Sequence, residues 1–351
     1  MSWLKSLFGK SEDKIVTLAP SQRSFPIGSQ ETILERALKE GIAYPHDCTV
    51  GTCGTCRSKL IMGAVDAITP FGYTLSREEL EQGYILACQA LPRGDVTVEI
   101  KTAERAMPLA RTGSARIVAS QALTHDILRV SWQVDTPFEY VAGQYFAINW
   151  PSGPGRRSYS FCEAPESGGR TLLSAFVRRV PGGAFSELLF AGDPRAVSFD
   201  IDGPHGNFWL RGGTGPMVCI AGGSGLSPLM SLLEDAAARG VKRDVVLLFG
   251  ARGERDIYCE EQIAAIERRW SGRFAFWPVL SETPVEGLRS GLVTAHIPEA
   301  LAWLGSETDP EAYLCGPPPM VDAAIEVLTD NAVPIDSIFY DRFTDASTSG
   351  A

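Results

Sequence analysis

DCTVGTCGTCRSK, residues 47–59, decides the fold of the N-terminal part of this chain. Its three cysteines stand in C-x4-C-x2-C spacing, and a fourth follows in YILACQA, residues 84–90. The four are Cys48, Cys53, Cys56 and Cys88. A loop that supplies three thiolates, with a fourth thiolate far downstream, is a ligand pattern of [2Fe–2S] clusters. The sequence therefore predicts a carrier of single electrons.

A four-cysteine zinc site is the alternative for these ligands. Zinc ribbons use two C-x2-C pairs, whereas this region has one, Cys53 and Cys56. The spacing therefore favours iron and sulfur over zinc.

The composition is that of a folded protein with more than one domain. The chain has 351 residues, which is long enough for two or three domains. Of these residues 44% are hydrophobic, and the net charge is −10. The negative charge argues against binding nucleic acid or an anionic membrane. No apolar stretch approaches the roughly 20 residues of a membrane span. The other four cysteines lack the spacing of a disulfide framework, so we expect a cytoplasmic protein.

Residues 12–103 are predicted to form short strands around one helix. KIVTLAP and RSFPI alternate as a hairpin would, and SKLIM and DVTVEIK are further strand candidates. The helix is expected over Thr32–Glu40, since Thr32 and Glu35 have capping-box spacing. Its apolar face is expected to comprise Ile33, Leu34, Ala37 and Leu38.

Two further patterns follow. In residues 111–212, strand-like segments rich in β-branched and aromatic residues are separated by Gly/Pro turns, which predicts a small antiparallel barrel. In residues 215–343, apolar strands alternate with helical stretches, which predicts a doubly wound parallel sheet. The expected fold class is therefore multidomain, α+β and α/β.

Two motifs in the barrel region suggest a site for a pyrophosphate. Arg157, Tyr159 and Ser160 form R-x-Y-S, and VPGGAFS follows with Gly182, Gly183 and Ser186. An arginine supplies charge, and a glycine pair at a helix start supplies backbone N–H donors. Each motif alone is weakly specific.

The third region has two turns of the same kind. AGGSGLSP, residues 221–228, follows an apolar strand and opens a helix; its glycines are Gly222, Gly223 and Gly225. CGPPPM, residues 315–320, ends a later strand. A glycine-rich strand-to-helix turn lets the backbone and the helix dipole approach a dinucleotide, although the G-x-G-x-x-G fingerprint is absent.

From residue 12 to 343 the chain resembles the reductase components of bacterial multicomponent oxygenases, especially those of toluene, phenol and methane-type diiron monooxygenases. Related reductases serve Rieske dioxygenases. The cysteine loop resembles plant-type ferredoxins, which have a β-grasp fold, and the other motifs resemble the ferredoxin–NADP reductase superfamily. The resemblance implies FAD, a [2Fe–2S] cluster and NADH as cofactors. It implies an oxygenase component or an intermediary ferredoxin as the partner of a monomeric chain.

The same resemblance implies roles for single residues. In the superfamily the arginine of R-x-Y-S contacts the FAD pyrophosphate, the tyrosine packs on the flavin, and the serine lies by flavin N5, where hydride arrives. These roles fall on Arg157, Tyr159 and Ser160. Cys315, followed by Gly316, would lie beside the nicotinamide, and Phe343 would stack on the flavin.

The choice between NADH and NADPH depends on Glu282. NADPH users of the superfamily tend to have an arginine there, whereas a carboxylate would repel the 2′-phosphate and accept a bond from a ribose hydroxyl. Arg252 is the opposing observation, because it could approach the adenosine end. We expect NADH.

Two rival functions share parts of this pattern. The same electron path could serve another acceptor, such as a deoxysugar dehydrase. A chain with a zinc-bound N-terminal module and vestigial nucleotide folds would be a non-catalytic scaffold. The scaffold is disfavoured because the cysteine, flavin and nicotinamide motifs are all intact and in order.

Overall fold

The structure is a computed structural model of the chain, and it describes residues 14–42, 44–46, 50–51, 54–100, 107–150, 155–191, 198–305 and 309–344. The chain forms two compact units, Met1–Glu104 and Arg105–Ala351. We call them the N-terminal unit and the C-terminal unit.

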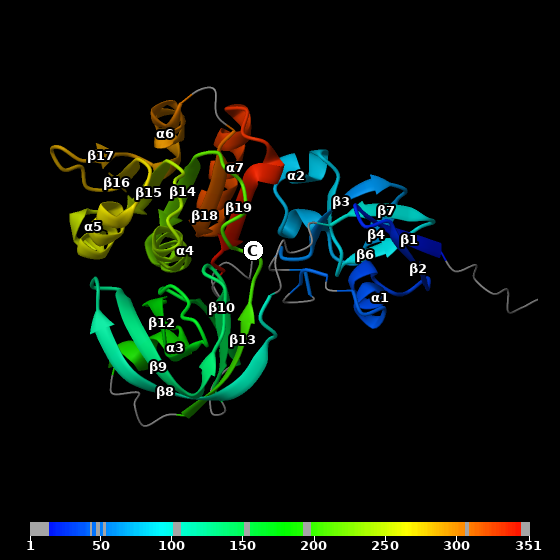
Figure 1. The fold of residues 1–351 in the computed structure, drawn as a ribbon, viewed down its shortest axis with the longest axis horizontal. Coiled ribbons are helices and arrows are strands. Elements are labelled where there is room, and N and C mark those ends of the chain that lie inside the picture. Colours follow the sequence, from blue (N-terminus) through cyan, green and yellow to red (C-terminus); the bar gives the residue numbers. More distant parts are fainter. Residues whose placement is uncertain are drawn as a thin grey trace, which may run out of the picture. The chain divides into compact units, whose positions relative to one another are not determined.

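The N-terminal unit is built on a mixed five-stranded sheet with the order β2-β1-β7-β3-β5 (Figure 1). β1 pairs with β2 in antiparallel and with β7 in parallel orientation. The strands are β1 (Lys14–Ala19), β2 (Arg23–Ile27), β3 (Arg57–Met62), β5 (Tyr84–Leu86) and β7 (Val96–Glu99), with a small separate pair of β4 (Val65–Ala67) and β6 (Ala90–Pro92). The predicted hairpin and later strands are confirmed.

The predicted helix is also present, as α1 (Ile33–Lys39). Thr32 is its N-cap and forms the expected capping box with Glu35, which satisfies N–H groups that the first turn leaves without partners. Ile33, Leu34 and Ala37 are buried, but Leu38 is 37% exposed. The apolar face is therefore narrower than predicted, because Leu38 lies at its edge.

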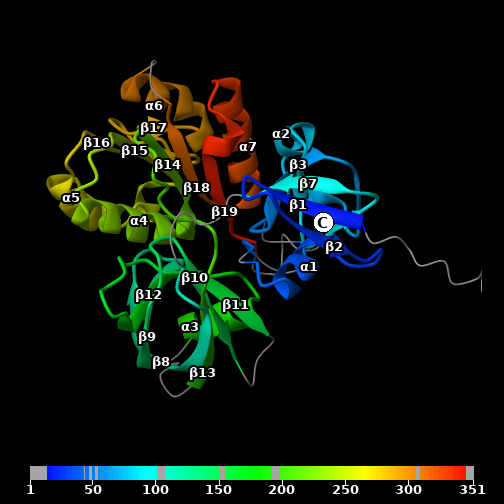
Figure 2. The same cartoon turned by 45° about the vertical axis from the view of Figure 1, so that its right-hand side comes forward.

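The first part of the C-terminal unit is a six-stranded antiparallel barrel with the order β11-β10-β13-β8-β9-β12. Its strands are β8 (Arg111–Ala122), β9 (Ile127–Phe138), β10 (Tyr145–Asn149), β11 (Arg156–Ser160), β12 (Arg170–Arg178) and β13 (Ser198–His205). The helix α3 (Ala184–Ala191) lies beside the barrel strands (Figure 2). Its Phe185 and Leu189 belong to the barrel core. The predicted barrel is confirmed.

The barrel has a seam where its edge strands, β11 and β12, meet. Just beyond the end of β11, the Cys162 N–H donates to the Ser174 carbonyl of β12 at 3.0 Å. An antiparallel ladder repeats this bond two residues along each strand, so the next pair in register is Ser160 and Phe176. A side chain from outside the barrel occupies that position, as described below.

The second part of the C-terminal unit is a parallel sheet with the order β17-β16-β15-β14-β18-β19. Its strands are β14 (Met217–Gly222), β15 (Val245–Ala251), β16 (Phe274–Leu280), β17 (Arg289–Ser290), β18 (Glu311–Gly316) and β19 (Ile338–Arg342). The helices are α4 (Leu226–Ala238), α5 (Glu260–Arg269), α6 (Ile297–Leu304) and α7 (Pro318–Asp330). Figure 1 shows α4 beside α5, and α6 beside α7.

The order of this sheet reverses between β14 and β18. From β14 the chain continues outward to β15 on one side, and it returns later to place β18 on the other side. In open α/β sheets, ligands bind at the carboxyl ends of the strands at this reversal. The AGGSGLSP and CGPPPM turns found in the sequence follow these two strands.

Candidate cofactor-binding sites

Two of the four predicted cluster ligands lie side by side in the N-terminal unit. The Sγ atoms of Cys56 and Cys88 are 3.3 Å apart and both residues are buried. Neither forms a disulfide, so the two sulfurs are neighbouring free thiols. Cys48 and Cys53 lie outside the described residues. The two described thiols fit a cluster that is held by cysteine sulfur.

Gly51, a described residue of the cysteine-rich segment, is held close to the rest of the N-terminal unit. The Thr74 hydroxyl donates to the Gly51 carbonyl, and Gly51 has a φ of +86°. A Cβ at Gly51 would lie 2.7 Å from Cγ of Gln89, so glycine is required both by the backbone conformation and by the close approach. The Gln89 amide also lies 3.8 Å from the Cys88 sulfur. The sequence did not indicate Gln89, because only the fold brings it to the loop.

In the barrel, the R-x-Y-S strand lies against the start of the glycine-pair helix. The ring centroids of Tyr159 on β11 and Phe185 on α3 are 5.7 Å apart, and Tyr159 also stacks on Trp132. Arg157 is exposed on the same strand, and its guanidinium donates to the Arg156 carbonyl at 2.9 Å. The two motifs, about 20 residues apart in sequence, are therefore neighbours in the fold.

The start of α3 leaves backbone donors for a ligand. The Glu187 N–H donates to the Gly183 carbonyl. Within the described ranges, the N–H groups of Ala184, Phe185 and Ser186 have no protein acceptor. The Ser186 hydroxyl is already bonded to the backbone of Val180 and Gly183. Ser186 therefore fixes the shape of the turn, and the helix start fits the pyrophosphate of FAD through its N–H groups.

Ser160 lies at the end of β11 and is buried. Its carbonyl accepts a hydrogen bond from the Ser227 hydroxyl of α4 at 2.8 Å. The end of the R-x-Y-S strand is therefore tied to the helix that follows the AGGSGLSP turn.

The two glycine-rich turns of the parallel sheet pack directly on each other. A Cβ at Gly225, in the short helix η3 (Gly223–Gly225), would lie 2.1 Å from the Cys315 carbonyl oxygen. A Cβ at Gly222 would lie 2.6 Å from the Met320 sulfur. Both glycines are thus required by contact between the turns at the reversal of the sheet.

Cys315 is fully buried at the end of β18. Burial, together with the nearby Asp341 carboxylate, raises the pKa of its thiol well above the usual value. The thiol is therefore neutral at physiological pH, and it presents a small uncharged group beneath the turn rather than a nucleophile.

Phe343 follows β19, the neighbour of β18. It is partly buried and donates its backbone N–H to the Gly316 carbonyl at 2.8 Å. This bond ties the near-terminal aromatic to the Cys315–Gly316 turn.

Glu282 and Arg252 are neighbours through their backbones, since the Glu282 N–H donates to the Arg252 carbonyl at 2.9 Å. The side chain of Glu282 is exposed. The guanidinium of Arg252 lies 2.8 Å from both the Asp126 and Asp256 carboxylates. Its charge is therefore already balanced by two carboxylates, which weakens the case for Arg252 as a 2′-phosphate ligand.

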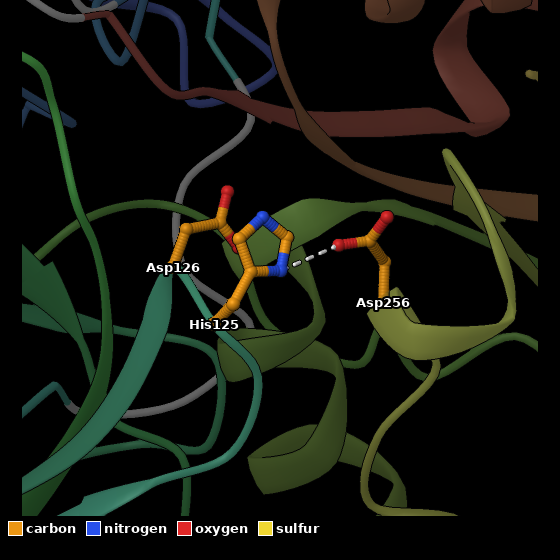
Figure 3. A group of neighbouring side chains, drawn as sticks. All are labelled: His125, Asp126 and Asp256. Atoms are coloured by element: carbon orange, nitrogen blue, oxygen red, sulfur yellow. Dashed lines mark ion pairs between the residues drawn. The ribbon is translucent and has the colours of Figure 1, made fainter.

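Arg252 links the barrel to the parallel-sheet part through the carboxylates of Asp126 and Asp256. Asp126 precedes β9 of the barrel, and Asp256 belongs to η4 (Glu254–Asp256) after β15. Figure 3 shows His125 between them, with its Nδ1 3.4 Å from Asp256. Burial works to raise the pKa of Asp126, but the Thr124 hydroxyl and the Arg252 guanidinium outweigh it and leave the pKa below its usual value.

Family models match the chain in three consecutive parts. Residues 16–93 match the 2Fe-2S iron-sulfur cluster binding domain, residues 114–209 the oxidoreductase FAD-binding domain, and residues 219–326 the oxidoreductase NAD-binding domain. The predicted cofactor classes and their order along the chain are therefore confirmed.

Relatives match over almost the whole chain. The xylene/toluene monooxygenase electron transfer component of Pseudomonas putida is 39% identical over 97% of this chain and 96% of its own length. The reductase subunit of an aromatic O-demethylase from an Amycolatopsis species is 35% identical over 90% of this chain and 95% of its own.

Among solved structures, a cytochrome P450 reductase from Amycolatopsis has a TM-score of 0.70 and 34% identity, covering 95% of this chain and 99% of that one. Among the described residues, no helix has the length and hydropathy needed to cross a membrane. Cluster-binding, FAD-binding and NAD-binding parts in this order, with full-length relatives of this kind, identify the chain. It belongs to the family of iron–sulfur flavoprotein reductases, NADH-dependent oxidoreductases that are the electron-transfer components of oxygenase systems.

Proposed function

We propose that the chain delivers electrons from NADH to the oxygenase component of a diiron monooxygenase that acts on aromatic hydrocarbons. The observation that supports this acceptor is the 39% identity, over nearly the full length of both chains, to the electron transfer component of a xylene/toluene monooxygenase. The bound FAD would supply the chemistry that accepts hydride from NADH, leaving NAD⁺, and the cluster would supply the means to pass single electrons to the acceptor.

On the flavin side, we assign Arg157 and the start of α3 to the pyrophosphate of FAD. The guanidinium would supply a charge-assisted contact. The N–H groups of Ala184 and Phe185 would donate from the positive end of the helix dipole. Tyr159 would pack beside the flavin, and the Ser160 hydroxyl would be its hydrogen-bond partner.

On the nicotinamide side, we assign the backbone of Gly222, Gly223 and Gly225 to the NADH pyrophosphate. Cys315 and Gly316 would lie under the nicotinamide, where a neutral buried thiol excludes water without adding charge. Phe343 would cover the flavin near the same turn, which is supported by its bond to Gly316.

Glu282 is the residue that we propose to select NADH. Its exposed carboxylate would repel the 2′-phosphate of NADPH and accept a hydrogen bond from the ribose hydroxyl. The ion pairs of Arg252 with Asp126 and Asp256 support this choice, because they leave the arginine less charge to offer a phosphate.

We also propose the module bounds 12–103, 111–212 and 215–343, with Cys48 and Cys53 as the remaining cluster ligands. The chain would act as a cytoplasmic monomer, and its net charge of −10 disfavours nucleic acid as a partner.

The test is anaerobic titration of the purified protein with NADH, followed by visible absorption. Flavin and iron–sulfur bands that bleach together are expected. Flavin bleaching without an iron–sulfur band would contradict the assignment of the four cysteines, and stoichiometric zinc in place of iron would contradict the electron path.

The acceptor is tested by coupled turnover. NADH oxidation that yields hydroxylated toluene with a purified toluene monooxygenase hydroxylase supports the diiron assignment. A Rieske oxygenase and a cytochrome P450 demethylase serve as the other arms. The P450 arm is included because of the Amycolatopsis relatives. Product formed only with the P450 demethylase would contradict the diiron acceptor and indicate a P450 instead.

A further inference from the structure

The Ser227 hydroxyl lies in the seam of the barrel although it belongs to the parallel-sheet part. Ser227 is the second residue of α4, two positions after Gly225. It is 1% exposed. Its hydroxyl donates to the Ser160 carbonyl at 2.8 Å and accepts from the Phe176 N–H at 3.2 Å.

These two groups are the ones that the ladder would otherwise join. The bond from the Cys162 N–H to the Ser174 carbonyl sets the register of β11 and β12, and the next bond in that register runs from the Phe176 N–H to the Ser160 carbonyl. The Ser227 hydroxyl is inserted into that bond as both acceptor and donor. Both backbone groups therefore bond to this hydroxyl in place of each other.

The inserted hydroxyl joins the two halves of the active centre. Ser160 is the residue assigned to the flavin, and Ser227 lies in the first turn of the helix that begins at the dinucleotide turn. A fixed donor–acceptor pair therefore sets the distance between the strand end that faces the flavin and the turn that faces the nicotinamide.

Two other residues of α4, one and two helical turns after Ser227, also bond to the barrel part. The Ser231 hydroxyl donates to the Glu163 carbonyl at 2.6 Å, and the Glu234 carboxylate accepts from the Ala164 N–H at 3.2 Å. Both partners lie beyond the seam, in the segment after β11. Ser231 is therefore a matched control: a buried serine of the same helix with a similar bond, but outside the ladder position.

We propose that Ser227 is a positioning residue for hydride transfer, given that the chain reduces FAD with NADH as proposed above. By occupying the ladder position between Ser160 and Phe176, its hydroxyl holds the flavin strand at the separation that the reaction requires. The rate of such a reaction depends steeply on the distance between the reacting atoms, and misplacing them by about 1 Å lowers the rate on the order of 10²-fold.

The test compares full-length, FAD-loaded wild type with S227A, S227T and S231A. Amide hydrogen exchange reports on the bond itself. In S227A the Phe176 amide should exchange about tenfold faster, which corresponds to the loss of one hydrogen bond. In S227T, which keeps the hydroxyl, and in S231A it should exchange as in wild type.

Anaerobic stopped-flow reduction by NADH reports on the role in the reaction. S227A should lower the limiting rate of flavin bleaching by about 10- to 100-fold with an unchanged half-saturating NADH concentration. S227T should restore the rate, and S231A should leave it unchanged. A wild-type limiting rate in S227A overturns the proposal, and so does an equal loss in S231A.

If S227A retains no FAD, the proposal is tested with the S227T variant instead. A wild-type rate in FAD-loaded S227T supports the role of the hydroxyl, and a tenfold lower rate contradicts it. Wild-type protein whose flavin is not bleached by NADH would instead overturn the proposed function, and the positioning role with it.

Discussion

Arg252 reaches Asp126 across the junction of the barrel and the parallel sheet, with 2.8 Å between Nη2 and Oδ2. The same guanidinium nitrogen lies 2.8 Å from Asp256 on its own side of the junction. An arginine next to the proposed nucleotide-selecting loop therefore has a structural task, and this shapes what we expect of its neighbours.

We expect E282R to shift the nucleotide preference toward NADPH. A guanidinium at this exposed position would supply a charge-assisted contact to the 2′-phosphate, which corresponds to about a 10- to 100-fold change in the ratio of kcat/KM values. Steady-state kinetics with both nucleotides measure it. E286R, an exposed glutamate four residues on, introduces the same charge change and should leave the ratio unaltered; an equal shift there would point to general electrostatics.

Asp126 should make the stability of the C-terminal unit sensitive to acid. Since its pKa is lowered in the folded state, its contribution is present above the unfolded-state pKa of about 4. The contribution is lost as the pH falls through the lower, folded-state pKa.

D126N should accordingly lower the melting temperature by about 1–3 °C at pH 7 and by less near pH 3. Tryptophan fluorescence is a suitable reporter, because six of the seven tryptophans lie in Arg105–Ala351. D200N, at an exposed barrel position, is the control. A difference between D126N and wild type that grows on acidification would contradict the ion-pair interpretation.

Gly225 should not tolerate alanine. The new Cβ would lie 2.1 Å from the Cys315 carbonyl oxygen, so the two turns would have to separate. We expect a loss of about 1–3 kcal/mol in the free energy of unfolding and a fall of about 10- to 100-fold in kcat/KM for NADH. In G253A the nearest atoms would be 3.6 Å away, and near-normal values are expected. Normal NADH kinetics in G225A would mean that the turns separate without consequence.

Arg157 should contribute to the retention of FAD. R157A removes one charge-assisted contact, and the Kd for FAD should rise about 10- to 100-fold. R156A is the matched control, since the neighbouring Arg156 is paired with Asp202 instead. Flavin fluorescence after dialysis gives the occupancy. Equal FAD loss from both variants would show that the strand as a whole, rather than Arg157, is responsible.

Cys56 should be needed for the cluster but not for the flavin. C56S removes one of the two adjacent described sulfurs, so the iron–sulfur absorption and the NADH-dependent reduction of cytochrome c should be lost. Reduction of ferricyanide, which takes electrons from the flavin, should persist. C259S, a cysteine of the C-terminal unit, should retain all three properties. Loss of ferricyanide reduction in C56S would indicate misfolding instead.

The sequence was sufficient for the features that depend on short-range patterns. The capping box of Thr32 and Glu35, the strand alternation of the barrel and the two glycine-rich turns each occupy a few consecutive residues, and the structure contains them. The side-by-side placement of Cys56 and Cys88 also agrees with what the cysteine motif implied.

Features that depend on contacts between distant residues could not be predicted. Arg252 and Asp126 are 126 positions apart, and Ser227 and Ser160 are 67 apart, and no spacing rule connects such pairs. The packing of Gln89 on Gly51 is of the same kind. Local sequence indicated which residues were chemically suited to a site, whereas only the fold shows which of them are already occupied by other partners.

The seam of the barrel has a consequence for how such chains can recombine during evolution. A barrel inherited without its parallel sheet would lack the Ser227 hydroxyl that joins the Phe176 N–H to the Ser160 carbonyl. Genetic exchange between reductases should therefore keep the barrel and the parallel sheet together, so that Ser227 stays with Ser160 and Phe176. Met1–Glu104 is a separate compact unit, so exchange of this segment alone would leave these bonds intact.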